Sequence, residues 1–305
     1  MTPVEERPSC LQLTLGPILF NWPTEQWSDF YRRIADEAPV DRVCVGEVVC
    51  SKRLALRFDA ISGVLERLER GGKEVVCATL ALPIMPRELH AIREVIEAGY
   101  LVEANDISTI HLLAGRPHVV GPFLNVYNED ALLLHRELGA TRICLSPELP
   151  LKQCLLIAAE NPTVEVFAFG RAPLALSARC YHAHAHGLSK DSCQFICERD
   201  LDGMDVYSID GQPFLAVNGI QTLGHGVTAA VAQVTSLRAA GIASLRLSPH
   251  ACDMVRVATT FRDLIDAQID PDEAQTILAS LSLPGPLTDG YLRGFAGARR
   301  LNEAD

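Results

Sequence analysis

Short segments with strand character alternate with amphipathic segments of helical period along most of the chain. Residues 11–15 alternate apolar and polar side chains, and residues 24–38 place Trp27, Tyr31 and Ile34 on one side of a helix. The same succession recurs as far as residue 268. The expected strands are residues 11–15, 42–49, 73–82, 100–104, 119–126, 142–145, 164–169, 214–218 and 244–247. The expected helices are residues 24–38, 58–69, 87–98, 129–138, 151–160, 227–240 and 254–268.

Regular strand–helix alternation predicts a parallel sheet covered by helices. About eight strands, most followed by a helix, favour an α/β fold of the (β/α)8-barrel type. An open doubly wound sheet is less suitable, because no glycine-rich dinucleotide fingerprint follows the first strand. The sequence therefore predicts one barrel domain over residues 11–298, between a flexible N-terminus (1–10) and a tail (299–305). Residues 179–210 interrupt the alternation with three cysteines and three histidines, and we expect them to form a functional excursion from the barrel.

Charge and composition narrow the classes of function. The chain has 27 Lys and Arg against 38 Asp and Glu, a net charge of −11, which works against binding nucleic acid or anionic lipid. Residues 1–10 lack an apolar signal region, and no uncharged apolar stretch reaches the length of a membrane span. We therefore expect a cytoplasmic protein, in which clustered cysteines more often bind metal or do redox chemistry than form disulfides.

Four of the ten cysteines are candidate ligands for one iron–sulfur cluster. Cys193 and Cys197 are four residues apart, so on a helix they would share one face. Cys180 precedes them by a loop long enough to fold back over that face. Cys50 is the fourth candidate, since the thiolates of a cluster can come from segments far apart in sequence.

Zinc is an alternative to the cluster. His182, His184 and His186 alternate with small residues, and on an extended segment they would point to one face. Together with Cys193 and Cys197 they would resemble a zinc site, although zinc would leave Cys50 without a role. A solvated, histidine-rich loop is the remaining interpretation of these three residues.

Polar residues recur at the strand ends where a barrel has its mouth. Glu47 follows the second strand, Glu103 ends the fourth and Asn125 ends the fifth, so these three are candidate catalytic residues of an acid- and amide-lined pocket. Each one alone is also typical of a helix cap or a loop contact. Nucleophilic catalysis has little support, because the chain has no Gly-x-Ser-x-Gly elbow and no recognisable pairing of cysteine, histidine and carboxamide.

Residues 165–180 resemble the signature of the collagenase-like peptidase family that includes YegQ-type proteins. That signature is Glu-x-Phe-x-His-Gly, then a cysteine, then Ser-Gly-(Lys/Arg)-Cys, and this chain has EVFAFG and SARC in the corresponding places. Two departures matter: Phe169 replaces the histidine of the signature, and Pro173 replaces its first cysteine. If that cysteine is a cluster ligand in the family, Cys50 is the candidate to replace it here.

The segments GEVVCSKR (46–53) and SARC (177–180), with shorter matches from about residue 13 to residue 297, are similar to the UbiV branch of that family. The resemblance implies a barrel-like domain with a [4Fe–4S] cluster held by Cys50, Cys180, Cys193 and Cys197. It implies anaerobic ubiquinone biosynthesis, as a subunit of a hydroxylase that modifies the ring of apolar ubiquinone precursors without dioxygen. A UbiU-like family protein is then the expected heterodimer partner, and a UbiT-like lipid carrier is expected nearby.

Two other classes stay open from the sequence. In the first, the chain is an electron-transfer or scaffold partner, and the active site lies in the other subunit. In the second, it is a zinc-dependent peptidase-like or RNA-modifying relative, although the negative charge counts against RNA and the missing nucleophile against proteolysis.

Overall fold

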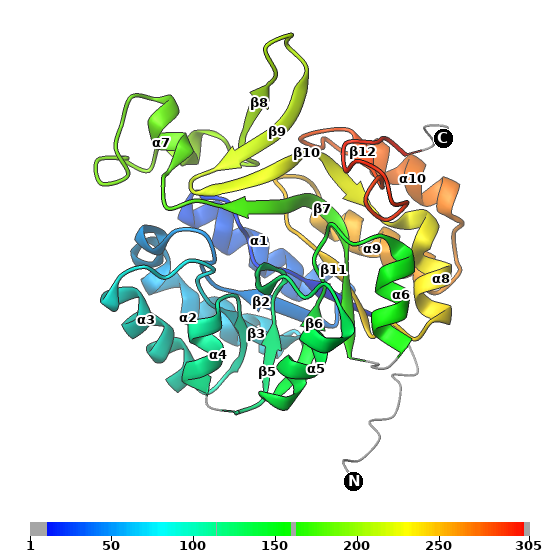
Figure 1. Ribbon diagram of the computed structural model, residues 1–305, viewed down its shortest axis with the longest axis horizontal. Helices are drawn as coiled ribbons and strands as arrows, with labels where there is room; N and C mark the ends of the chain where they lie inside the picture. Colours follow the sequence, from blue (N-terminus) through cyan, green and yellow to red (C-terminus); the bar gives the residue numbers. More distant parts are fainter. Residues whose placement is uncertain (1–10, 114, 160–162, 302–305) are drawn as a thin grey trace.

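The computed structural model describes residues 11–113, 115–159 and 163–301, and most of them build a closed barrel of parallel strands around one core. Strand β11 pairs with both β1 and β7, which closes the barrel and confirms the predicted (β/α)8 fold (Figure 1). The strands in barrel order are β1 (Gln12–Leu15), β2 (Arg42–Val45), β3 (Glu74–Ala78), β4 (Leu101–Ala104), β5 (His118–Val120), β6 (Ala140–Cys144), β7 (Val164–Leu176) and β11 (Ser244–Leu247). The predictions for residues 1–10 and 302–305 fall outside the described residues.

Helices surround the barrel. All of them follow a barrel strand in the chain except α8, which follows β10 (Gln221–Ala229). They are α1 (Thr24–Glu37), α2 (Leu54–Arg70), α3 (Pro86–Glu97), α4 (Ile107–Leu113), α5 (Glu129–Glu137), α6 (Leu151–Ala159), α8 (Val234–Ala239) and α9 (Met254–Ile265). Helix α1 buries Trp27, Tyr31 and Ile34, the face that its sequence period predicts. None of the helices in the described residues is long and apolar enough to span a bilayer.

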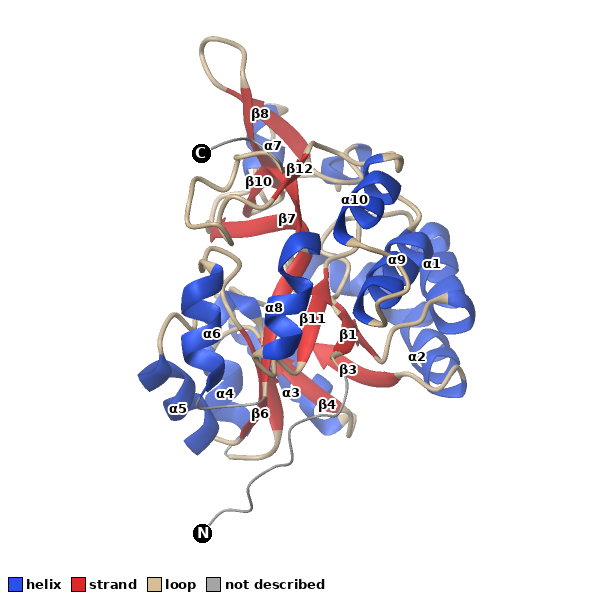
Figure 2. Ribbon diagram, turned by 90° about the vertical axis from the view of Figure 1, so that its right-hand side faces the viewer, coloured by secondary structure: helices blue, strands red, loops and turns tan. Residues whose placement is uncertain are grey.

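An antiparallel extension stands on the carboxyl ends of the barrel strands (Figure 2). Strand β7 runs on beyond the barrel and pairs with β10 (Gln221–Ala229), which pairs with β9 (Pro213–Asn218), which pairs with the edge strand β8 (Met204–Tyr207). Short helix α7 (Tyr181–Ala185) and β12 (Leu287–Thr288), which pairs with β10, join this layer, whereas α10 (Pro271–Ala279) packs on α9.

The extension corrects two expectations from the sequence. Residues 214–218 are a strand, as predicted, but they belong to the extension, and the eighth barrel strand is Ser244–Leu247. Residues 227–229 end strand β10 and do not begin a helix, because their backbone pairs with β7. The predicted helix over 227–240 is therefore reduced to Val234–Ala239.

Gly170 lets β7 serve both the barrel and the extension. Its φ is +119°, in the region that favours glycine, and a Cβ there would lie 2.7 Å from the Cβ of Ser248. The chain can turn past β11 at this point only with a residue that has no side chain.

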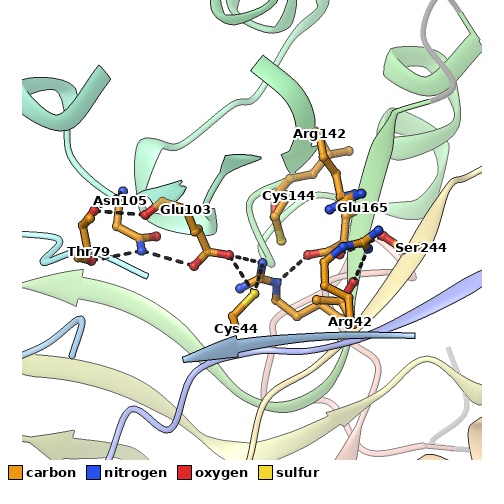
Figure 3. A network of polar contacts seen from close by, with 12 residues as sticks. Arg42, Cys44, Thr79, Glu103, Asn105, Arg142, Cys144, Glu165 and Ser244 are labelled. Carbon is orange, nitrogen blue, oxygen red and sulfur yellow. Dashed lines mark hydrogen bonds and ion pairs between the residues drawn. The ribbon is translucent and has the colours of Figure 1, made fainter. Parts of the chain in front are cut away.

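Figure 3 shows Glu103 and Glu165 in a network of polar contacts, and both carboxylates are buried. Arg246, also buried, bonds both of them and so joins three barrel strands. Its Nε donates to Glu165 Oε1 at 2.6 Å, and its Nη2 donates to Glu103. Ser244 Oγ donates to the other oxygen of Glu165 at 2.7 Å. Burial alone would raise the pKa of Glu165, but Arg246 and Arg42 outweigh it and lower this pKa to about 2. Ion pairs between Arg246 and the two carboxylates thus connect the strands inside the barrel.

Two buried histidines predict how stability depends on pH. His118 in β5 and His135 in α5 have lowered pKa values, chiefly because burial disfavours the charged imidazole. The unfolded chain takes up these protons near pH 6.5, so the unfolded state binds more protons and stability falls as the pH drops from 7 to 5. Each histidine contributes at most about 1.4 kcal/mol per pH unit.

The test is urea unfolding at pH 7, 6 and 5 with His135→Leu. We expect this variant to lose part of the acid sensitivity, while His111→Gln, at an exposed histidine, keeps all of it. If the free energy of unfolding of His135→Leu depended on pH as strongly as that of the unaltered protein, His135 would not be a source of the acid sensitivity.

Candidate metal centre

The loop that carries Cys50 leaves β2 at the carboxyl end of the barrel. Glu47 is buried there, and its Oε1 accepts hydrogen bonds from the backbone N–H groups of Val49 and Cys50, both at 2.8 Å. Gly46 has φ +154°, and a Cβ there would lie 2.2 Å from the carbonyl oxygen of Ala78. Gly46 and the Glu47 carboxylate together fix the backbone conformation of the loop at Cys50.

Cys193 and Cys197 are brought together by a tight turn and not by a helix. Gln194 and Phe195 have φ values of 49° and 54°, and a short 3-10 helix begins at Ile196. The prediction that the two cysteines share one helical face is therefore wrong, because two left-handed residues reverse the chain between them.

Cys180 begins α7, whose first turn it caps. Its Sγ accepts a hydrogen bond from the backbone N–H of Ala183 at 3.4 Å. The histidines that follow lie on this helix, so the expectation of an extended segment with three histidines on one face is also wrong. His182 is buried, whereas His184 and His186 are exposed.

All four candidate cysteines border one hollow between the Cys50 loop and the extension. Cys197 is buried, and Cys50, Cys180 and Cys193 are half-buried. None of the four is in a disulfide. The hollow is lined by Cys50, Lys52, Arg53, Cys180, His182, Lys190, Cys193, Phe195, Ile196, Cys197 and Gly219. Its charged lining is thus cationic, with three basic side chains and no carboxylate among these described residues.

Arg53 is the buried cation of this hollow, and it was not singled out from the sequence. Its Nη2 donates to Cys197 Sγ at 3.4 Å and to Asn218 Oδ1 at 2.9 Å. Arg53 forms an ion pair with Glu47, with 3.9 Å between Arg53 Nη1 and Glu47 Oε1. The buried Nε of Arg53 has no hydrogen-bond partner among the described residues. Burial works against the charge, but Glu47 and Cys197 outweigh it and raise the pKa of Arg53.

Four thiols around one hollow are a donor set whose chemistry fits a thiolate-ligated cluster. Among the described residues, no three His, Cys, Asp or Glu side chains are arranged to hold one metal ion. A cubane stands between its four thiolates and holds them further apart than one tetrahedral ion does. A thiolate-ligated cluster is also anionic, which fits a lining with Arg53, Lys52 and Lys190.

His182 is held in place by hydrogen bonds on both ring nitrogens. Its Nε2 lies 2.7 Å from Asp200 Oδ2, and its Nδ1 accepts from the backbone N–H of Gly219 at 3.4 Å. Burial lowers the pKa of His182, against the opposing effect of Asp200. This imidazole therefore ties α7 to the extension, and it has no nitrogen free for a metal or a substrate in this arrangement.

The three candidate catalytic residues are not brought together. Glu47 holds the Cys50 loop, and Glu103 lies inside the barrel, where it accepts from Arg246 and from Asn105 Nδ2 at 3.2 Å. Asn125 is exposed after a 3-10 turn, with φ 53°. None of the three lines the cysteine hollow.

A second, small hollow lies at the mouth of the barrel. It is lined mostly by apolar residues at strand ends: Gly16, Pro17, Leu19, Pro122, Phe123, Phe167, Pro173, Arg246 and Ser248. The backbone carbonyl of Leu19 accepts from Arg53 Nη1 at 2.9 Å and from Asn218 Nδ2 at 2.6 Å. Leu19 and Arg53 therefore separate an apolar hollow from the cysteine hollow.

Most of the chain matches a known protein family. The sequence model of a family described as Peptidase family U32 matches residues 24–301, which include the barrel, the extension and all four candidate cysteines.

Proposed function

The chain belongs to peptidase family U32, and we propose that it serves as the iron–sulfur subunit of a dioxygen-independent hydroxylase. The proposed cofactor is a [4Fe–4S] cluster with Cys50, Cys180, Cys193 and Cys197 as ligands. The observation that carries the proposal is that these cysteines, from two distant segments, border a single cation-lined hollow at the barrel mouth.

When bound, the cluster would supply one-electron transfer or polarise an oxygen donor. The protein's own residues prepare the site. Glu47 orients the Cys50 loop, and Arg53 donates to Cys197 Sγ and offsets thiolate charge in a buried setting. Burial raises the pKa of the Cys50 thiol although Arg53 opposes it, so this thiol keeps its proton until a metal displaces it.

The proposed substrate is the ring of an apolar ubiquinone precursor, as in UbiV-type proteins. The barrel-mouth hollow has a lining of suitable chemistry, with Phe123, Phe167 and the prolines beside them, but it holds no more than about one water molecule in this arrangement and would have to widen to admit a ring. Arg246 and Ser248 are the polar groups of its lining. A UbiU-like subunit is the proposed heterodimer partner, and a UbiT-like carrier would deliver the lipid.

Hydrolysis is a weaker alternative, despite the family's description. A histidine that serves as a general base needs a free nitrogen within reach of its substrate. The two buried histidines paired with aspartate have none: His182 bonds Asp200 and Gly219, and His250 Nδ1 bonds Asp202 while its Nε2 accepts from Arg171 N at 2.9 Å.

Complementation tests the proposal. The gene and that of its UbiU-like partner would be expressed in a bacterium that lacks its own copies, grown without dioxygen, and quinones would be measured by mass spectrometry. We expect ubiquinone to be restored, with Cys50→Ala inactive and Cys252→Ala active. Accumulation of unhydroxylated precursor despite a loaded cluster would contradict a role of this chain in the hydroxylation.

Glu47 gives a second prediction at the same loop. Glu47→Ala removes the acceptor of two backbone hydrogen bonds, and hydrogen bonds to a charged group are each worth about 1.5–3 kcal/mol. Since about 1.4 kcal/mol is a factor of ten, we expect iron loss to a chelator to accelerate about tenfold or more. Glu47→Gln keeps an acceptor oxygen and should fall between that variant and the unchanged protein. Equal rates for all three would show that Glu47 does not position the ligand.

A further inference from the structure

The cysteine hollow and the two grooves beside it have mostly basic charged linings, although the chain as a whole has a charge of −11. The cysteine hollow shares Lys52 and Phe195 with a groove on one side, and Cys180 and Lys190 with a groove on the other. These grooves add Arg87 to the first lining and Arg179 to the second. A continuous depression therefore crosses the cysteine-rich face.

The described residues that line this depression include five basic side chains and a single carboxylate. That carboxylate is Glu88, which accepts from Ser51 and from the backbone N–H groups of Ile84 and Met85 at 2.7 and 2.9 Å. It is buried and lowers the local positive charge only in part. Exposed Asp191 lies next to the depression, 3.8 Å from Lys52 Nζ.

Two of the cations extend into solvent and stand beside apolar side chains. Arg87 and Arg179 are exposed, and so are Ile84, Met85 and Tyr181 next to them in sequence. Figure 1 shows α7 and the amino ends of α2 and α3 on the same side of the molecule. Charged groups around exposed apolar residues are typical of a surface for another protein and not of a site for a small ion.

The proposed ligands differ in solvent exposure, and this difference indicates which side of a cluster would face the depression. Cys197 and Arg53 lie on the inner side, whereas Cys180 and Cys193 are half-buried, and Cys180 borders the outer groove as well. A cluster held by these residues would thus approach the surface within the basic depression.

We propose that this face docks a small acidic one-electron carrier of the ferredoxin type. The proposal rests on the proposed function, since it requires the cluster. One electron passes from the reduced carrier to the oxidised cluster, so the carrier is oxidised by one electron and the cluster is reduced by one, and no bond forms or breaks. The basic side chains increase the rate of encounter, as complementary charge does for other protein pairs.

The experiment uses the anaerobically purified holoprotein and a reduced acidic [2Fe–2S] ferredoxin. Arg87→Glu with Arg179→Glu changes the charge of the depression by four units. Arg136→Glu with Lys152→Glu makes the same change on exposed residues of α5 and α6. We would measure the binding of labelled ferredoxin by fluorescence anisotropy and the reduction of the cluster by stopped-flow absorbance, at low and high salt. Reduced methyl viologen, a small cation, serves as the reductant that needs no docking.

We expect the first double variant to bind and accept electrons from ferredoxin at least about tenfold more slowly at low salt, with the difference lost at high salt. Its reduction by methyl viologen should be unchanged, and the α5–α6 variant should match the unaltered protein. Equal effects of both variants would overturn the docking site and leave the cluster in place. Tighter binding of an RNA oligonucleotide than of ferredoxin would overturn it in favour of nucleic acid. Absence of any cluster would overturn both the docking site and the proposed function.

Discussion

Replacing Arg246 by methionine is expected to lower the free energy of unfolding by about 3–5 kcal/mol, because removing one partner of a buried ion pair leaves charge unpaired in the core. Arg246 holds both Glu165 and Glu103, and neither carboxylate is exposed. Whole domains have about 5–15 kcal/mol of stability, so this loss is a large fraction of the total. Urea unfolding followed by circular dichroism measures it.

Two further variants separate lost charge from lost packing. Adding Glu103→Gln to Arg246→Met removes one of the stranded charges and should recover part of the stability. Arg67→Met breaks a solvent-exposed pair with Asp36, in which the two side chains are 43% and 42% exposed, and should cost far less stability than Arg246→Met. If Arg246→Met were as mild as Arg67→Met, the network of Figure 3 would not stabilise the barrel.

Replacing Cys50 by alanine is expected to abolish cluster loading, since one of the four proposed thiolate ligands is lost. The other three proposed ligands come from one segment, so Cys50 is the residue that would join the proposed cluster to the β2 side of the barrel. The measurement is iron per chain together with visible absorbance after anaerobic purification. We expect both to fall to background.

Cys252→Ala is the matched control. Cys252 is also half-buried, but it lies after β11 and does not border the cysteine hollow, and burial raises the pKa of its thiol to about 12. This variant should retain the iron content of the unaltered protein. A cluster that survives Cys50→Ala intact would remove Cys50 from the ligand set, whatever the effect of the control.

The barrel could be predicted from the sequence because each of its units repeats the same pattern. The buried face of α1, with Trp27 and Ile34, follows directly from helical spacing. The extension could not be predicted in the same way. Strand β10 is mostly buried and has no clean alternation, and its strand identity comes from pairing with distant β7 and β9. Local pattern cannot reveal such long-range pairing.

The sequence predicted which residues belong to the candidate site but not how their side chains are arranged. The cysteine residues and their motifs indicated which thiols to consider, and the structure brings them to one hollow. Arg53 was missed because an arginine in a loop gives no sign from sequence that it will be fully buried. Glu103 and Asn125 were both expected at strand ends, yet Glu103 lies within β4 and is buried, whereas Asn125 follows a 3-10 turn after β5 and is exposed. Side-chain direction at a strand end depends on packing that the sequence pattern does not specify.

The most direct test of the account is the inorganic content of the anaerobically purified protein, with iron, zinc and acid-labile sulfide measured per chain and EPR recorded after reduction by dithionite. The account predicts about four irons and about four sulfides per chain, with the signal of a reduced [4Fe–4S] cluster. Zinc without sulfide would contradict it and return the four cysteines to a structural or hydrolytic metal site.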